Sequence, residues 1–442
     1  MTQFKGGTVA AIAILSLGQL ASAQTAVRMR ENFPVDYSYQ VSSRAELNGS
    51  LSLPANMQKD KGPKTLALSG STTVEYAERV LEADADGVRK TVRVYSRMDY
   101  RRKVGEQVQE SQLRPEVRRM VMLHAGNAEA PFSPDGPLLF SEIDMVRTEV
   151  FTPALRGMLP QGEVREGDRW QASENAVLKL ADLESLNDGR LTCKLQEVAT
   201  RDGRRYARVG FSGVLTGTNA DGANRQQLDG YYFFDLQSNH LSYLYLNGTS
   251  WMLDKDGKEV SKVEGRYVLT RRLDAGPEVR AEALRGVALE PNPENTRLLF
   301  HEPGMGVRFV YPRRWTVRQA DARQITLDEP AGGGLLITLE PLSQTPTGQQ
   351  FLAEATAFLT KQAAKIRRSE KLETLRGNPE LLEHFLFETE LDKQQVVLDY
   401  YVARQSAGGA TFAGRYPNKE ATELRKDAEQ IARSLQLIPP KR

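Results

Sequence analysis

Hydrophobic and polar residues alternate with a period of two along much of the chain before residue 275, which predicts β-strands with one buried face. The clearest runs are residues 35–41, 92–96, 191–198, 206–215, 228–236, 241–246 and 263–269. Asp-Gly dipeptides, which favour tight hairpins, recur among these runs, and none follows Gly257. Residues 24–275 are therefore predicted to form a mostly antiparallel β domain, for which a half-barrel is one possible form. A helical interruption is expected between residues 137 and 158.

The pattern changes after residue 295, where strands are mixed with two helical stretches. Val307, Phe309 and Tyr311 lie on one face of a predicted strand that Pro312 ends. A first helix is predicted to begin near Thr345, and a second after an N-cap at Asn418. The buried stripe expected for the first helix is Phe351, Leu352, Ala355, Phe358, Leu359, Ala363 and Ile366.

These patterns predict two domains of α+β class. Residues 296–438 are expected to form an α+β sandwich, with strands before and after the first helix in the sequence. Residues 276–295 contain three prolines and are predicted to be a linker between the sandwich and the β domain.

The N-terminal residues have the features of an export signal. Lys5 precedes an apolar stretch, residues 7–20, and the small residues 21–23 form an A-x-A cleavage site. Residues 1–23 are therefore predicted to be a signal peptide, and the mature protein is expected to be periplasmic or secreted. No later segment is apolar over 18 residues, so the product is predicted not to span a membrane.

Composition excludes little beyond nucleic-acid binding. The 59 basic and 57 acidic residues give a net charge of +2, which does not favour a polyanionic partner. Cys193 is the only cysteine, and it shares a strand face with Leu191 and Leu195. It is predicted to be a buried core thiol rather than a nucleophile.

No pattern of residues identifies a reaction. The four histidines are isolated in the sequence, so no metal site is predicted. Ser212 lacks the glycine spacing of a nucleophile elbow. The glycines at 332–334 lead into an apolar run rather than a helix, so they do not predict a phosphate loop. We therefore predict no catalytic residue, no metal and no cofactor, and we expect that the protein is not an enzyme.

One aromatic cluster is a candidate binding site. Tyr231, Phe233, Tyr243 and Tyr245 lie in two neighbouring predicted strands. Packing across a hairpin accounts for such a cluster. The alternative is a wall that contacts an apolar ligand in a half-open sheet.

The C-terminal third resembles the PsbP-like superfamily, which includes DcrB-like bacterial envelope proteins. The resemblance is carried by residues 306–315 (GVRFVYPRRW), by residues 409–417 (GATFAGRYP), and by the helix that ends in residues 432–437 (ARSLQL). It implies an α+β fold and a non-catalytic binding or assembly role, and it carries over no site residue.

The earlier part resembles exported bacterial proteins of unknown function, of the type seen in planctomycetes. Residues 136–145 (GPLLFSEIDM) and 159–170 (LPQGEVREGDRW) carry this resemblance, with the closing strands through Tyr267. The expectation is thus an exported, non-catalytic binding or assembly protein of the bacterial cell envelope, with an envelope protein or a hydrophobic molecule as partner. A carrier of a hydrophobic ligand or lipid is the first alternative, and an uncharacterised enzyme is the second.

Overall fold

A computed structural model describes residues 26–53, 64–125, 128–147, 150–274, 276–376, 381–391 and 393–439. The predicted signal peptide, residues 1–23, lies outside these described residues. Within them, the strands form sheets of 13, seven, four and two strands. The protein is therefore mostly β, as the alternating pattern predicts.

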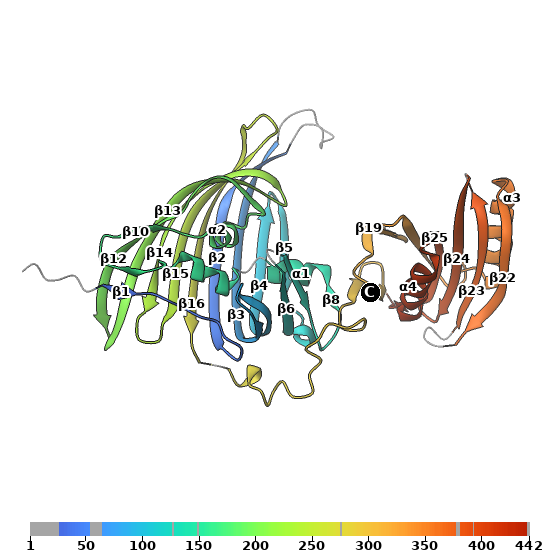
Figure 1. The fold of residues 1–442 in the computed structure, drawn as a ribbon. Coiled ribbons are helices and arrows are strands. Elements are labelled where there is room, and N and C mark those ends of the chain that lie inside the picture. The colour runs from blue at the N-terminus through green and yellow to red at the C-terminus, as the bar shows by residue number, and fades with distance from the viewer. Residues whose placement is uncertain are drawn as a thin grey trace, which may run out of the picture.

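The largest sheet is curved, antiparallel and 13-stranded (Figure 1). Its main path runs β10-β12-β13-β14-β15-β16-β2-β3-β4-β6-β7, while β11 pairs with β13 and β5 pairs with β4. The bounds are β2 (Ser38–Leu53), β3 (Lys64–Ala83), β4 (Val88–Val104), β5 (Gln107–Gln112), β6 (Arg119–Ala125), β7 (Ala128–Phe132), β10 (Arg169–Gln171), β11 (Ser185–Gly189), β12 (Thr192–Arg201), β13 (Arg204–Asn219), β14 (Gly222–Asp235), β15 (His240–Leu253) and β16 (Glu259–Arg272).

Several Asp-Gly dipeptides lie in turns of this sheet, but not every Asp-Gly dipeptide does. Asp202 and Gly203 both have positive φ, at 50° and 75°, in the tight turn between β12 and β13. Asp229 and Gly230, in contrast, lie inside β14. A Cβ on Gly230 would lie 2.1 Å from the Tyr245 carbonyl oxygen. Glycine is needed there for close packing rather than for a turn.

An irregular segment covers one face of the large sheet. It contains α1 (Phe140–Arg147), η3 (Thr152–Met158) and α2 (Glu174–Ala181), with the short pair β1 (Val27–Arg28) and β9 (Glu163–Val164) beside them (Figure 1). The Tyr232 hydroxyl donates to the Met158 carbonyl at 2.9 Å. The helical interruption predicted for residues 137–158 is confirmed, whereas α2 was not predicted.

The second large sheet is antiparallel and has a helix on each face. Its order is β19-β20-β21-β25-β24-β23-β22. The bounds are β19 (Thr316–Asp321), β20 (Gln324–Glu329), β21 (Gly333–Glu340), β22 (Lys365–Leu375), β23 (Leu381–Leu391), β24 (Gln394–Gln405), β25 (Gly408–Pro417), α3 (Gly348–Lys361) and α4 (Ala421–Ser434). Leu359 of α3 packs with Phe385, while Leu424 of α4 belongs to the core that contains Leu386 on the opposite face of β23.

Both predicted helices are present, but their beginnings differ from the predictions. Thr347, not Thr345, is the N-cap of α3, and it forms a capping box with Gln350. Glu420, not Asn418, precedes α4, and its side chain makes no capping bond. The local Thr-x-x-Gln spacing outweighs the signal of the Thr-Pro pair.

The buried stripe predicted for the first helix is wrong at three positions. Phe358 is 52% exposed and Ile366 is 42% exposed, and Ala363 is exposed beyond the end of α3. The helix α3 ends at Lys361, and Ile366 belongs to β22. The direction of the Ile366 side chain is therefore set by the strand and not by the helical period. Phe358 lies outside the contact that Ala355 and Leu359 make with the sheet.

A small sheet crosses the predicted boundary at residue 295. Its order is β26 (Gln436–Leu437), β18 (Val307–Tyr311), β17 (Leu298–Glu302) and β8 (Leu138–Leu139), and β8 pairs with β17 in parallel. The predicted linker also makes contacts, because Val279 in η4 (Pro277–Val279) is buried and Leu284 packs with Val92. A further 3₁₀ turn, η2 (Pro115–Val117), precedes β6.

Candidate functional site

The four predicted aromatic residues do come together, on the face opposite the core. Tyr231 pairs with Tyr245 and Phe233 pairs with Tyr243 in the register of β14 and β15. The intervening Tyr232 is fully buried beneath the covering segment. Because side chains alternate along a strand, the four rings lie on the other face, where each is half-buried. We call these four residues the aromatic surface.

The rings of the aromatic surface contact one another. Ring centroids lie 5.4 Å apart for Tyr231 and Tyr245, 5.9 Å apart for Tyr231 and Tyr243, and 5.8 Å apart for Phe233 and Tyr243. Burial raises the pKa of Tyr243, and a hydrogen bond with Tyr231 raises it further. The Tyr243 hydroxyl therefore stays protonated at neutral pH and keeps a proton to donate.

Two arginines lie beside the aromatic surface. The guanidinium carbon of Arg208 lies 4.7 Å from the Tyr231 ring centroid, and that of Arg201 lies 5.3 Å from the Phe233 centroid. Both distances are within the range of cation–π attraction. These two arginines were not predicted from the sequence. Arg208 lies between Ala207 and Val209, which are buried on the other face of β13, and this alternation could have placed Arg208 on the outer face.

A cavity lies at each end of the aromatic surface. The first, of about 710 Å³, is lined by Tyr231 and Tyr245 together with the cationic side chains of Arg169, Lys194 and Arg208. The second, of about 730 Å³, is lined by Phe233, Tyr243 and Arg201, among others. The surface thus combines half-exposed rings, cations and hydroxyl donors, which are the groups enriched at binding interfaces.

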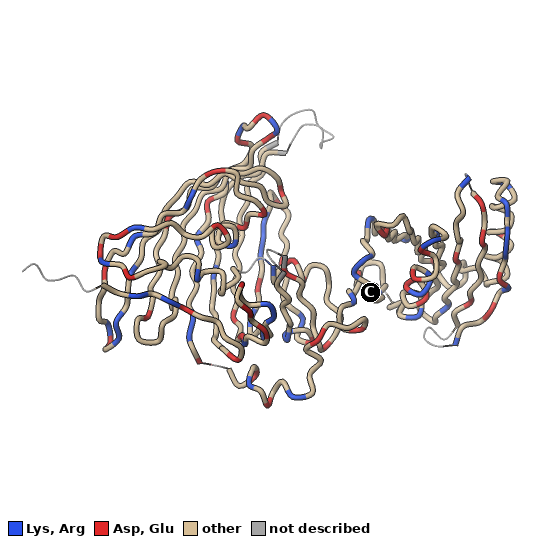
Figure 2. Tube along the Cα trace, viewed as in Figure 1, with Lys and Arg blue, Asp and Glu red and all other residues tan. Residues whose placement is uncertain are grey.

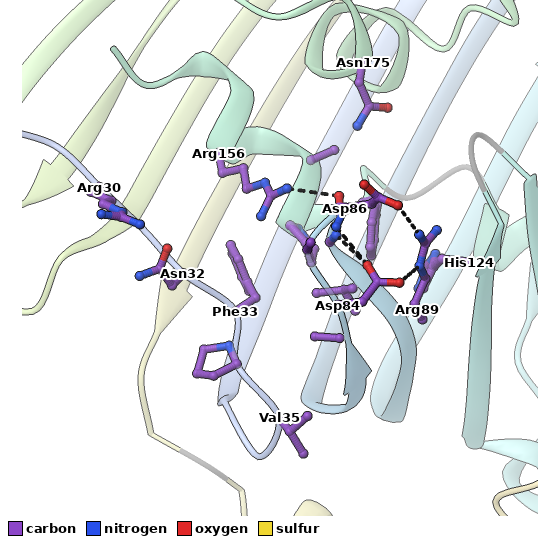
Figure 3. A pocket seen from close by; sticks show the side chains of 18 of the residues that line it. Arg30, Asn32, Phe33, Val35, Asp84, Asp86, Arg89, His124, Arg156 and Asn175 are labelled. Atoms are coloured by element: carbon purple, nitrogen blue, oxygen red, sulfur yellow. Dashed lines mark hydrogen bonds and ion pairs between the residues drawn. The ribbon is translucent and has the colours of Figure 1, made fainter. Parts of the chain in front are cut away.

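A second candidate site lies where the chain enters the large sheet. A cavity of about 840 Å³ is lined by residues 30–35, η3, the turn between β3 and β4, and the beginning of α2 (Figure 3). Within it, Arg89 forms ion pairs with Asp84 at 2.6 Å and with Asp86 at 2.8 Å. Arg156 Nη2 donates to the Asp86 carbonyl at 3.1 Å.

An adjoining cavity extends this site. It has about 790 Å³ and shares Arg30, Asn32, Arg156 and Asn175 with the first cavity, so the two cavities adjoin at these side chains. The added lining residues include Arg28, Gln161, Trp170 and Gln171. Trp170 is half-buried, and its indole N–H donates to the Met158 carbonyl at 2.8 Å.

His124 lies in the wall of the larger cavity. Its ring stacks on Phe151 with centroids 3.9 Å apart. Burial lowers the pKa of His124 to about 3, with further lowering by the charges of Arg93 and Lys179. The imidazole is therefore neutral, and its Nε2 atom is buried with no hydrogen-bond partner among the described residues.

Two buried ion pairs fix the strands next to this site. Arg271 pairs with Glu31, and Arg93 Nε donates to Glu78 at 2.8 Å. Tyr39 links the two pairs, because its hydroxyl donates to Glu78 at 2.6 Å and its ring lies under the Arg271 guanidinium. The sequence analysis did not predict these pairs, since charged residues at core positions are rare unless they are paired.

The remaining predictions concern the histidines, the cysteine and the charged residues. Among the described residues, no cluster of histidine, cysteine and carboxylate side chains could hold a metal ion. Cys193 is buried, as predicted, and burial raises the pKa of its thiol to about 12. Lysines and arginines alternate with acids along both large sheets (Figure 2). In the described part of the chain, no helix is both long and apolar enough to cross a membrane.

Comparison with known proteins shows folds but no family. No family model matches the chain, and no curated protein matches it. The Ran-binding protein Mog1p of Saccharomyces cerevisiae is 9% identical over 32% of this chain and 96% of its own, with a TM-score of 0.25. The cyanobacterial PsbP protein of Synechocystis is 13% identical over 32% and 92%, with a TM-score of 0.24.

A third similar structure covers a larger part of the chain. Lipovitellin is 10% identical over 57% of this chain and 27% of its own, with a TM-score of 0.31. Structures with Mog1-like and PsbP-like folds are thus similar to about a third of the chain, at low TM-score and identity. These similarities are too weak to support a function.

Proposed function

We propose that the protein is an exported, non-catalytic binding or assembly protein of the bacterial cell envelope, and that the aromatic surface contacts its partner. The observation that carries this proposal is the position of Tyr231, Phe233, Tyr243 and Tyr245 on the sheet face opposite the core, with Arg201 and Arg208 beside them. Tyrosine and arginine dominate the energetically important positions of protein interfaces. The four rings are half-exposed, so they stay accessible to a partner.

The carrier alternative makes a different demand on the same sheet. A lipid or other apolar molecule needs an enclosed apolar space. The face of the sheet that carries Tyr232 is instead covered by η3 and α2, and Gln226 donates to the Ala181 carbonyl of α2 at 2.8 Å. The covering segment is therefore attached to the sheet by hydrogen bonds, which favours a partner on the outer face.

The test is affinity purification of the full chain from its own cells, compared with a variant of the aromatic surface. We expect the unchanged protein to recover a specific envelope protein, and Tyr231→Ser combined with Tyr245→Ser to reduce that recovery at least tenfold. Because the two rings lie outside the core, the double variant should keep its fold, with a stability loss of about 1 kcal/mol.

A matched control lies on the same two strands and the same face. Gln227 and Thr249 pair across β14 and β15, four residue pairs away from the pair of Tyr231 and Tyr245. Gln227→Ala with Thr249→Ala should leave recovery of the partner unchanged. If the Tyr231 and Tyr245 variant retains the partner, or if no specific partner is recovered, the proposal is wrong. A lipid that co-purifies with the protein in native mass spectrometry would favour the carrier instead.

A further inference from the structure

The segment before β2 presents three polar side chains on one face. Val27, Met29, Glu31 and Phe33 are buried, whereas the alternate residues Arg28, Arg30 and Asn32 are exposed. This alternation is that of an extended strand, in which residues two apart lie roughly 6.6 Å apart on the same side. The exposed residues therefore form a row along one edge of the cavities described above.

The buried face of this segment holds the row in place. Arg271 pairs with Glu31, the Leu241 amide donates to Glu31 at 3.1 Å, and the Phe33 ring lies under the Arg271 guanidinium. β1 also pairs with β9, with Arg28 opposite Glu163. Because the backbone is fixed on both sides, Arg28 and Arg30 need little reorganisation of the chain to contact a ligand.

A third arginine faces the same space from another element. Arg156 of η3 lines both cavities, together with Asn175 in the first turn of α2 (Figure 3). In the 790 Å³ cavity the other polar groups are the neutral side chains of Asn32, Gln161, Gln171 and Ser173. Arginine side chains and side-chain amides from two separate parts of the chain thus line one cavity, and Arg156 also donates to the Asp86 carbonyl.

The charge in the 790 Å³ cavity is one-sided. Among the described residues, Arg28, Arg30 and Arg156 make no ion pair with a carboxylate, and Glu31, the only acid in the lining, is paired with Arg271. Asp84 and Asp86 line only the 840 Å³ cavity, where both pair with Arg89. The lining of the 790 Å³ cavity is therefore positive, whereas in the 840 Å³ cavity Arg30, Arg89 and Arg156 are balanced by Asp84, Asp86 and Glu174, so an anion is attracted to the 790 Å³ side.

We propose that Arg28, Arg30 and Arg156 form a binding site for the phosphate group of a ligand, in the 790 Å³ cavity beside Trp170. A phosphate monoester carries nearly two negative charges and a phosphodiester about one, and arginine donates two parallel N–H groups to the oxygens of either. Three guanidinium groups supply enough positive charge for such a group. The neutral amides and Trp170 supply contacts for the rest of the ligand. The site is independent of the aromatic surface.

The test measures binding to the full chain from two sources of phosphate. One arm uses isothermal titration calorimetry with inorganic phosphate and with glycerol 3-phosphate. The other uses co-sedimentation with phosphatidylcholine vesicles with and without phosphatidylglycerol. Binding in either arm that weakens as salt is raised supports the site. Binding to the soluble phosphates assigns a soluble ligand, and binding only to phosphatidylglycerol vesicles assigns a lipid headgroup.

Variants separate this site from general surface charge. We expect Arg30→Gln with Arg156→Gln to weaken binding at least tenfold, while Arg44→Gln, which removes an exposed arginine paired with Glu46 on β2, leaves it unchanged. Both variants should keep the thermal unfolding midpoint, because the replaced side chains are exposed. The proposal is overturned by an absence of binding in both arms, by equal binding to the double variant, or by an equal loss in Arg44→Gln.

Discussion

The two large sheets hold their covering elements by different means. The 13-stranded sheet is covered on one face by an irregular segment, and its interior contains the Arg93–Glu78 pair, in which both side chains are fully buried. The seven-stranded sheet is covered on both faces by regular helices, through apolar residues such as Leu359 and Leu424. Both covers bury apolar side chains, including Leu155 and Leu180 in the irregular segment. The comparison is between a cover that adds hydrogen bonds to its apolar packing and helices that pack mainly through apolar side chains.

The difference follows from what each covering element can offer. A helix presents a stripe of apolar side chains, so packing alone fixes it to a sheet. The irregular segment and the strand before β2 have few regular backbone partners, and their polar groups need specific acceptors once buried. Buried ion pairs and hydrogen bonds supply these acceptors, at the cost of sensitivity to the loss of one partner.

The largest effect is expected from breaking a buried pair in the 13-stranded sheet. Arg93→Met leaves the Glu78 carboxylate without its cation in the core, which should reduce the free energy of unfolding by about 3–5 kcal/mol. Arg97→Met is the matched control, because Arg97 lies on the same strand, is 53% exposed and pairs with Asp99. Its effect should be below about 1 kcal/mol. Urea denaturation measures both.

A double variant distinguishes pairing from packing. Glu78→Gln added to Arg93→Met removes the stranded charge and should recover part of the lost stability. A loss of less than about 1 kcal/mol for Arg93→Met alone would contradict the view that this sheet depends on its buried charges.

A smaller effect is expected from the helical cover of the seven-stranded sheet. Leu359→Ala leaves a cavity beneath α3 and should cost about 3 kcal/mol. The neighbouring Phe358 is 52% exposed, so Phe358→Ala should cost less than about 1 kcal/mol despite its larger ring. Equal losses for the two variants, measured by urea denaturation, would mean that α3 does not pack as described.

Much of the fold could be predicted from periodicity. The alternation of Val307, Phe309 and Tyr311 correctly gave β18, and the two strands predicted to carry the aromatic residues are β14 and β15. These predictions succeed because side-chain direction is a local property of a strand. The same holds for α3 and α4, whose apolar spacing spans three to four turns.

The missed features depend on partners far away in the sequence. Arg271 and Glu31 are 240 residues apart, and the pairing of Leu138 with Leu298 joins β8 to β17 across the predicted boundary. Nothing local marks such contacts. The row of Arg28, Arg30 and Asn32 is different. Val27, Met29 and Phe33 alternate with these polar residues, and this local signal was overlooked when the first strand was predicted at residues 35–41.

The histidines of the two sheets should respond to pH in opposite directions. In the seven-stranded sheet, burial lowers the pKa of His384, but bonds to Asp399 at 2.7 Å and Glu373 at 3.2 Å raise it above 6.5 overall. Its contribution to stability is therefore complete below pH 6.5 and is lost as pH rises through the folded pKa. In the 13-stranded sheet, burial lowers the pKa of His124 to about 3 and that of His240 to about 4. Their unfolded forms take up protons first, so stability falls as pH drops below 6.5.

Single glutamine variants isolate these contributions, which are the smallest predicted here. Between about pH 7.5 and about pH 5, the free energy of unfolding of His124→Gln should fall by on the order of 1–2 kcal/mol less than that of the unchanged protein. His384→Gln should instead remove a gain that the unchanged protein shows over the same interval. Urea denaturation at the two pH values measures both effects, and His301→Gln, at an exposed position, is the control. If His124→Gln and His384→Gln shift the pH dependence in the same direction, the two sheets do not differ in the way their buried charges indicate.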